Sequence, residues 1–146
     1  MENNPIFNTF QEKNHLNIIF SSTLKNVDRA CRYTLTFLSQ SIPAFRHEFE
    51  INLLMREGLM NAVKHGNEFS PDKLVHFTIR VCQPDTILME IEDQGDGFKW
   101  YEMGHDLPDD YAESGRGIFI IRQYYSLAKY NAKGNHLTIH KQLNIE

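Results

Sequence analysis

Cysteine is scarce in this chain, and its scarcity excludes two kinds of stabilisation. The 146 residues include two cysteines, Cys31 and Cys82, which lie far apart and form no CxxC pair. Structural zinc sites and disulfide frameworks require closely spaced or numerous cysteines. We therefore expect neither a zinc site nor a disulfide, and we expect both side chains to be buried thiols.

An excess of positive charge is also missing. Fifteen lysines and arginines stand against nineteen acidic residues, giving a formal net charge of -4, and the basic residues are scattered along the chain. Proteins that bind duplex nucleic acid concentrate positive charge on one face, because they must neutralise phosphates. We therefore expect no direct nucleic-acid partner.

Long apolar runs are absent as well. No stretch approaches the ~20 apolar residues of a membrane-spanning helix, and Met1 to Pro5 contain no basic segment followed by an apolar one. We expect a cytoplasmic protein with no membrane partner. A hydrophobic content of 41% is enough to bury one core at this length. Residues 1–146 are interpreted as a single domain, with residues 1–14 as a loose N-terminal arm.

Hydrophobic periodicity predicts an α+β protein. Apolar spacing indicates a strand at 16–20, a helix at 24–38, a helix at 45–65 ending near Gly66 and Asn67, strands at 74–81 and 86–91, a helix at 117–125, and strands at 127–130 and 136–140. Residues 99–114 have the composition of a loop. This order predicts a two-layer α/β sandwich with helices on one face of a mostly antiparallel mixed sheet.

The second predicted helix carries a stripe of residues spaced alternately by four and three, which places them on one face. They are Glu50, Leu54, Glu57, Asn61 and Lys64. The amide oxygen of Asn61 could anchor Mg²⁺, which keeps several waters and needs few protein ligands. Glu57 could accept a proton from an attacking hydroxyl. Alternatively, the stripe is an ordinary solvated helix face.

Two glycine segments follow this helix. Asp93 could accept a hydrogen bond from an exocyclic amine, while Gly95 and Gly97 would let backbone approach a flat ligand. Residues 114–117 precede an apolar helix and could present backbone N–H groups to phosphate. Each segment alone is equally typical of a turn or a helix start. Together, in this order, they suggest ATP, with the acidic loop between them as either a mobile lid or a solvated surface segment.

The pattern resembles that of a known family. Glu57-x-x-x-Asn61-Ala62-x-x-His65-Gly66 resembles the N box of the GHKL ATPases, which share the Bergerat ATP-binding fold; Asp93-x-Gly95-x-Gly97 resembles their G1 box and Gly115-Arg116-Gly117 their G2 box. Within this superfamily, the chain is most similar to the small bacterial anti-sigma-factor serine/threonine kinases. The resemblance spans roughly residues 16–142.

The resemblance implies a role for the adenine and metal positions. Asp93 would bind the adenine amino group, and Gly95 and Gly97 would shape the adenine pocket. Asn61 would hold Mg²⁺, and Glu57 would act as the catalytic base. The implied cofactors are therefore ATP and Mg²⁺.

The phosphate contacts follow from the same resemblance. Gly115, Arg116 and Gly117 would meet the phosphates. Lys64 and His65 resemble the N-box ending of sensor histidine kinases, in which the corresponding positions approach phosphate. The resemblance thus assigns residues to every part of a bound nucleotide.

The choice of subfamily depends on neighbouring domains. A sensor histidine kinase needs a helical dimerisation domain, which we do not expect before Leu16, and it usually has Asn at the position of Glu57. The gyrase and chaperone branches need large additional domains. The resemblance therefore favours an anti-sigma-type kinase that phosphorylates a serine or threonine of a STAS-type anti-anti-sigma protein.

The implied partners are that STAS-type protein and a sigma factor or another response regulator, in a partner switch; homodimerisation is left open. One alternative is a nucleotide-gated binding module that sequesters a regulatory partner without significant kinase activity. A third is a structural α+β domain that binds no nucleotide.

Overall fold

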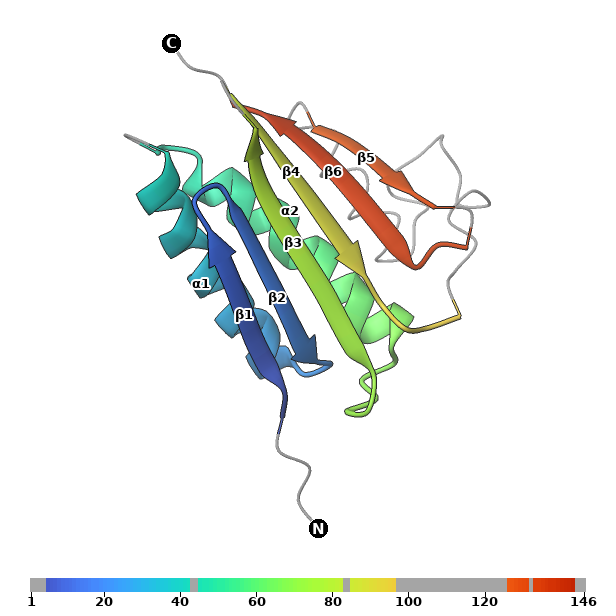
Figure 1. Ribbon diagram of the computed structural model, residues 1–146. Coiled ribbons are helices and arrows are strands. Elements are labelled where there is room, and N and C mark those ends of the chain that lie inside the picture. Colours follow the sequence, from blue (N-terminus) through green and yellow to red (C-terminus); the bar gives the residue numbers. More distant parts are fainter. Residues whose placement is uncertain (1–4, 43–44, 83–84, 97–125, 132, 144–146) are drawn as a thin grey trace.

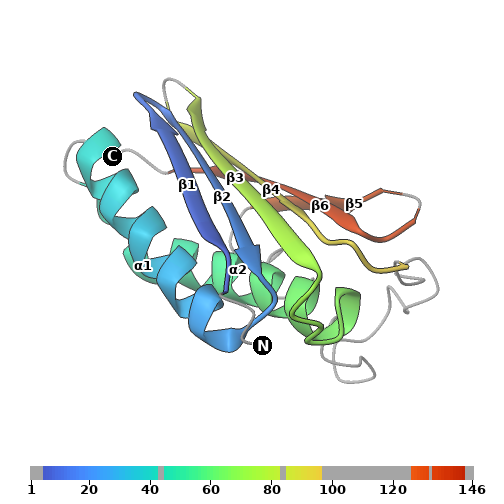
Figure 2. The same cartoon turned by 60° about the horizontal axis from the view of Figure 1, so that its bottom comes forward.

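The computed structural model describes residues 5–42, 45–82, 85–96, 126–131 and 133–143. The elements are β1 (Phe7–Glu12), β2 (His15–Ser21), α1 (Leu24–Ser41), α2 (Glu48–Asn61), the π-helical turn η1 (Ala62–Gly66), β3 (Leu74–Cys82), β4 (Thr86–Glu92), β5 (Ser126–Tyr130) and β6 (His136–Gln142). The strands form one sheet in the order β1-β2-β3-β4-β6-β5, and both helices cover one face of it (Figures 1 and 2). The predicted two-layer α+β sandwich is confirmed, and every described strand pairing is antiparallel.

The core lies between the sheet and the two helices. Side chains of a strand alternate between its faces, so every second residue of the inner strands points toward the helices. The fully or nearly fully buried strand residues include Leu16, Ile18, Phe20, Val75, Phe77, Ile79, Ile87, Met89, Ile91, Leu137 and Ile139. The helices contribute Val27, Ala30, Phe37, Leu38, Ile51, Leu54, Met55 and Leu59. Between the buried positions of β3, His76 and Arg80 are exposed on the opposite face.

The prediction of a loose arm over residues 1–14 is wrong for residues 7–12, which form β1. This strand pairs with β2 from Phe7 opposite Phe20 to Glu12 opposite His15. Five of its six side chains are exposed, so it has no buried alternation for a periodicity argument to detect. Its backbone ladder with β2 holds it instead, and residues 13 and 14 form the short turn between them.

Helix α1 begins at the predicted residue because Thr23 caps it. The Thr23 hydroxyl oxygen accepts a hydrogen bond from the Asn26 N–H at 3.1 Å, which satisfies a donor of the first turn. The helix continues to Ser41, beyond the predicted end at residue 38. Arg56 of α2 forms an ion pair with Asp28 of α1 on the exposed side of the two helices.

The two cysteines are free thiols. Cys31 is buried as expected, and burial raises the pKa of its thiol to about 11. Cys82 is half-buried at the end of β3, so the prediction of a buried thiol holds fully for Cys31 alone.

The second predicted helix is α2 followed by the π turn η1, which ends at the predicted Gly66. The prediction that Leu54 shares a polar face is wrong, because Leu54 is fully buried. Helix α2 packs against both α1 and the sheet, so its buried sector is wider than one stripe. Glu50 of the same stripe pairs with the buried ammonium of Lys141 on β6, at 3.1 Å.

The two predicted hairpins are present as β3–β4 and β5–β6. The predicted loop at 99–114 and the predicted helix at 117–125 lie outside the described residues. None of the helices within the described ranges combines the length and apolar content that a bilayer crossing requires.

Candidate functional site

The end of the second helix and the end of β4 meet at two glycines. A Cβ on Gly66 would lie 2.2 Å from Oδ2 of Asp93, and a Cβ on Gly95 would lie 1.9 Å from the carbonyl oxygen of Gly66. Any larger residue at either position would force the two segments apart. The π turn brings Gly66 to this contact, and the Asn67 N–H closes the turn by donating to the Ala62 carbonyl at 2.8 Å. The N-box and G1-box segments are therefore packed directly against each other.

Asp93 is held in place by backbone groups. Its Oδ1 accepts a hydrogen bond from the Gly95 N–H at 2.9 Å, and its own N–H donates to the Asn135 carbonyl at 2.9 Å. Asp93 is 8% exposed. No described residue donates a hydrogen bond to Oδ2, so this oxygen is available to a ligand donor.

Burial also sets the protonation of Asp93. Desolvation raises the pKa of its carboxyl to about 6, and Glu92 adds to this effect. The Gly95 N–H, Lys133 and Lys73 act in the opposite direction but do not cancel it. At neutral pH the carboxylate is therefore the prevailing form, close to its titration range.

Asn61 lies beside Asp93. It is the last residue of α2, is 9% exposed, and its side chain forms a hydrogen bond with the hydroxyl of Tyr130 on β5. Desolvation raises the Tyr130 pKa to about 12, so the phenol stays neutral, although the hydrogen bond with Asn61 acts in the opposite direction. Asn61, Asp93 and Tyr130 line a common cavity, together with Gly58, Ala62, Gly66, Ile91 and Leu137.

That cavity has a volume of about 10 Å³ between the described residues. A volume of this size is near the minimum for a single water. The described residues thus form one wall of a site, with the Asp93 carboxylate and the Asn61 amide at the same place. Gly97, Gly115, Arg116 and Gly117, which were predicted to complete it, lie outside the described residues.

The other predicted residues lie nearby. Glu57 is half-buried one turn before Asn61 on α2, Lys64 is half-buried in η1, and His65 is exposed in η1. Among the described residues, none of these three lines the cavity shared by Asn61 and Asp93. Their roles stay predictions.

Asn67 is a site residue that the sequence argument missed. Its side chain is fully buried and donates to the Ser22 hydroxyl at 2.8 Å and to the Leu74 carbonyl at 3.0 Å. Its Oδ1 accepts from the Gln94 N–H at 2.8 Å. Through these hydrogen bonds, Asn67 connects the turn after Asp93 to Ser22, between β2 and α1, and to the start of β3. Periodicity could not identify it, because the position after a helix-ending glycine looks like an ordinary surface cap.

Tyr130 was missed for a different reason. In the sequence it is one of several aromatic and apolar residues of a predicted strand, which is the pattern of ordinary core packing. Its partner Asn61 lies 69 positions earlier, so only the packing of α2 against the folded sheet brings the two together.

These features define the class of protein. The chain belongs to the family of histidine kinase-like ATPase domains, whose model matches residues 20–141. The resemblance to GHKL ATPases inferred from the motifs is thereby confirmed.

Individual relatives of this chain have a more specific name than the domain family. The chain is 25% identical over 116 residues to the anti-sigma F factor of Priestia megaterium, covering 77% of this chain and 79% of the relative. It is 24% identical over 127 residues to the anti-sigma F factor of Anoxybacillus flavithermus, covering 84% and 86% of the two chains.

A solved structure shares the fold. The histidine kinase domain of the Erythrobacter litoralis EL346 blue-light activated histidine kinase superposes with a TM-score of 0.52 at 16% identity. The match covers 82% of this chain and 60% of that chain. At this identity the likeness concerns the fold alone.

Proposed function

We propose that this protein is an ATP- and Mg²⁺-dependent serine/threonine protein kinase of the anti-sigma-factor type, which phosphorylates a STAS-type antagonist. The observation that carries the proposal is the available Oδ2 of Asp93, fixed against Gly66 beside the Asn61 amide. A buried acceptor with a fixed direction suits an exocyclic amine, because the ionised carboxylate has acceptor oxygens and no donor. The name of the matched family, which describes an ATPase domain, also supports the proposal of ATP binding.

Asn61 is the proposed Mg²⁺ ligand. The described residues contain no group of three or more His, Cys, Asp or Glu side chains that could form a metal cage. Mg²⁺ bound mostly by phosphate oxygens and waters needs only one protein oxygen, so the Asn61 amide suits this role. The Tyr130 hydroxyl, as its hydrogen-bond partner, would fix the orientation of the amide.

Glu57 is the proposed catalytic base. It would accept the proton of the substrate hydroxyl while that oxygen attacks the γ-phosphorus, the bond to the β-phosphate oxygen breaks, and ADP leaves. Its position one helical turn before Asn61 supports this role. Lys64 and His65 of η1, together with Gly115, Arg116 and Gly117, are proposed to meet the phosphates, and Gly95 and Gly97 to border the adenine.

The proposed partners come from the relatives. Proteins named anti-sigma F factors match most of this chain, so we assign it a partner switch. In that switch, the protein holds a sigma factor or another response regulator, or it phosphorylates and releases a STAS-type anti-anti-sigma protein.

The test is transfer of radiolabelled phosphate from ATP to STAS-type proteins encoded nearby. We expect serine or threonine labelling by the native protein, loss of labelling by Glu57→Gln with ATP binding retained, and normal labelling by Glu48→Gln. Glu48 is a matched control, because it is an exposed acid in the first turn of the same helix. ATP binding without transfer to any candidate would favour the nucleotide-gated binding module, and absence of ATP binding would overturn both.

A further inference from the structure

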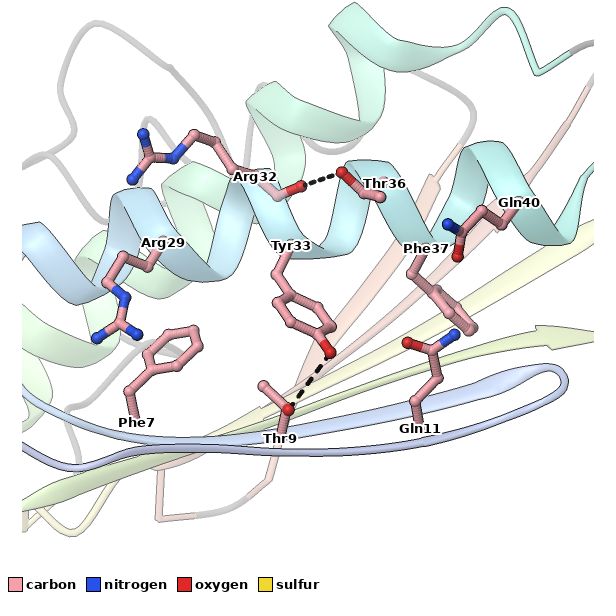
Figure 3. Close-up of a pocket in the computed structure, with 9 residues that line it drawn as sticks. All are labelled: Phe7, Thr9, Gln11, Arg29, Arg32, Tyr33, Thr36, Phe37 and Gln40. Atoms are coloured by element: carbon pink, nitrogen blue, oxygen red, sulfur yellow. Dashed lines mark hydrogen bonds between the residues drawn. The ribbon is translucent and has the colours of Figure 1, made fainter.

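A second concave surface lies at the β1 edge of the sheet, three strands away from β4 in the sheet order. A groove of about 540 Å³ runs between β1 and α1. Phe7, Thr9 and Gln11 line it from β1, and Arg29 and Tyr33 are among the residues that line it from α1 (Figure 3). This volume is within the range of ordinary ligand sites. The groove is formed by the hairpin strand that sequence periodicity did not detect.

The groove is positively charged. Arg29 and Arg32 both line it, and no Asp or Glu does. Among residues 5–42, four lysines and arginines stand against two acids, whereas the whole chain has a net charge of -4. Of those two acids, Asp28 is paired with Arg56. The local charge therefore favours an anionic ligand.

The two arginines occupy different places. The Arg29 guanidinium lies 4.0 Å from the centre of the Phe7 ring, inside the groove. In Figure 3, Arg32 extends from the rim of the groove, on the far side of α1 from β1. No carboxylate of the described residues pairs with either side chain. Stacking on Phe7 holds the Arg29 fork in place and leaves its N–H groups for a carboxylate.

The backbone of β1 adds a second kind of binding group. β1 is the first strand of the sheet order, so one of its edges faces no described strand. The Ser21 N–H donates to the Ile6 carbonyl at 2.9 Å, which makes this a hydrogen-bonded antiparallel pair. Because such pairs alternate, the N–H and C=O groups of Phe7, Thr9 and Gln11 point away from β2. The residues that line the groove therefore also present the free backbone edge.

We propose that β1 and α1 form a docking site for an acidic peptide segment of a partner protein. The segment binds in an extended conformation as an added strand on β1, and a carboxylate of the segment meets Arg29, while Arg32 at the rim adds to the positive charge of the groove. Main-chain pairing supplies affinity, and alternate side chains supply specificity. Side chains two residues apart in a strand are separated by about 6.6 Å, so acids at alternate positions face the groove together. This site is separate from the nucleotide site and does not depend on it.

The first experiment measures fluorescence anisotropy with a labelled nonapeptide of alternating Thr and Glu. A peptide with Gln in place of Glu is the matched probe. We expect the Glu peptide to bind at least about tenfold more tightly than the Gln peptide, and its affinity to fall as ionic strength rises from about 0.05 to about 0.3 M, since salt screens exposed charges. Equal binding of the two peptides would overturn the acidic character of the partner.

Charge variants locate the site. Arg29→Gln combined with Arg32→Gln should weaken binding of the Glu peptide by about tenfold or more, as expected when the charged contact with Arg29 and the positive charge at the rim are both lost. Arg80→Gln should not change it, because Arg80 is exposed on β3 and faces away from the helices. Thermal melting of each variant distinguishes loss of binding from loss of fold. Unchanged binding in the double variant, or an equal loss in Arg80→Gln, contradicts the proposal.

A backbone variant tests strand addition. Thr9→Pro removes an N–H that points to the free edge, a position where an edge strand tolerates proline. Thr9→Val is the matched control, because it also loses the contact of 3.4 Å between the Thr9 and Tyr33 hydroxyls but keeps the N–H. We expect Thr9→Pro to abolish peptide binding and Thr9→Val to retain it. Peptide binding that survives Thr9→Pro overturns strand addition. The proposal is also overturned if the chain forms a dimer that Thr9→Pro dissociates and that addition of the peptide leaves intact.

Discussion

Asp93 combines two properties that rarely occur in one carboxylate: it is buried, and one of its oxygens has no donor among the described residues. Gly95 fixes Oδ1, and the missing Cβ of Gly66 leaves room for the other oxygen. Burial without full hydrogen bonding raises its pKa. Both the proposed adenine contact and this carboxyl's contribution to the pH dependence of stability therefore depend on Asp93.

Asp93→Asn should weaken ATP binding by about tenfold to a hundredfold, measured by isothermal titration calorimetry with Mg²⁺. The amide places an N–H group where the carboxylate accepted, and a hydrogen bond to a charged group is worth ~1.5–3 kcal/mol. Asp96→Asn serves as the control, because Asp96 is exposed three residues further on. An equal loss in both variants would show that net charge, rather than the Asp93 contact, governs binding.

The pH dependence follows from the raised pKa of Asp93, about 6 in the folded protein against 3.8 for a freely solvated aspartate carboxyl. Between these values the folded state binds more protons than the unfolded state, so this carboxyl makes stability fall as pH rises from about 4 to about 6. The contribution is on the order of 2 to 3 kcal/mol, at ~1.4 kcal/mol for each unit of pKa.

Urea denaturation of the native protein and of Asp93→Asn across this pH range isolates that contribution, because the other carboxylates are common to both. We expect the free energy of unfolding of the native protein, relative to the variant, to decrease as pH rises. ATP affinity should change in the opposite direction and fall below pH 6, where the acceptor becomes protonated. A flat difference between the two proteins would contradict the assignment.

At the scale of elements, the π turn, β2, β3 and β4 are joined by a single side chain. Asn67 contacts the end of β2 through Ser22, the start of β3 through Leu74 and the end of β4 through Gln94. If the amide is removed, the Leu74 carbonyl and the Gln94 N–H lose this partner, whereas the Ser22 hydroxyl still donates to the Lys73 carbonyl at 2.7 Å. The glycine contact at the site thus depends on a neighbouring polar network.

Asn67→Ala should lower the free energy of unfolding by about 2 to 4 kcal/mol, because buried donors and acceptors left unpaired cost ~1–3 kcal/mol each. Chemical denaturation measures this loss. Asn17→Ala is the control, since Asn17 makes an exposed contact of 3.1 Å with His76, and we expect a loss under about 1 kcal/mol there. Similar losses in the two variants would remove the argument for Asn67.

Periodicity predicted the elements that bury one face. The hairpins of β3–β4 and β5–β6, the start of α1 and the end of the second helix at Gly66 all follow from alternation, capping or helix-stop residues. β1 escaped detection because its side chains are mostly exposed, and Leu54 was misassigned because α2 is covered on two sides. Pairwise spacing within one element cannot show which other elements will cover it.

The candidate site, like the fold, was predictable only where it depends on local sequence segments. Asn61 and Asp93 were brought together as the motif order predicted, because motifs describe local segments that meet at one end of the sheet. Asn67 and Tyr130 were not predictable, because their partners come from distant segments. Contacts between residues far apart in sequence depend on the fold rather than on local pattern.

For the whole molecule, the two concave surfaces lie over different strands of one sheet. Asp93 follows β4, whereas the arginine-lined groove is bordered by the edge strand β1. A nucleotide at the first surface should stabilise the entire domain, because both surfaces share one core.

Addition of ATP and Mg²⁺ at about 100 times the dissociation constant should raise the free energy of unfolding by ~2.7 kcal/mol. Differential scanning fluorimetry and urea denaturation should show this for the native protein and for Glu57→Gln. Asp93→Asn should show a stabilisation of about 0.4 to 1.4 kcal/mol at the same concentration, as its weaker binding requires. A stabilisation that Asp93→Asn retains in full would place the nucleotide elsewhere.

The pairing of β4 with β6 has a consequence for biosynthesis. The backbone N–H of Asp93 is anchored by the carbonyl of Asn135, which lies 42 residues later in the chain. While a ribosome is still making the C-terminal hairpin, Asp93 has been translated but its anchor has not. The newborn chain therefore cannot complete the corner around Asp93 before Asn135 has been translated. Under the proposed function, ATP can act as a folding aid only after that point.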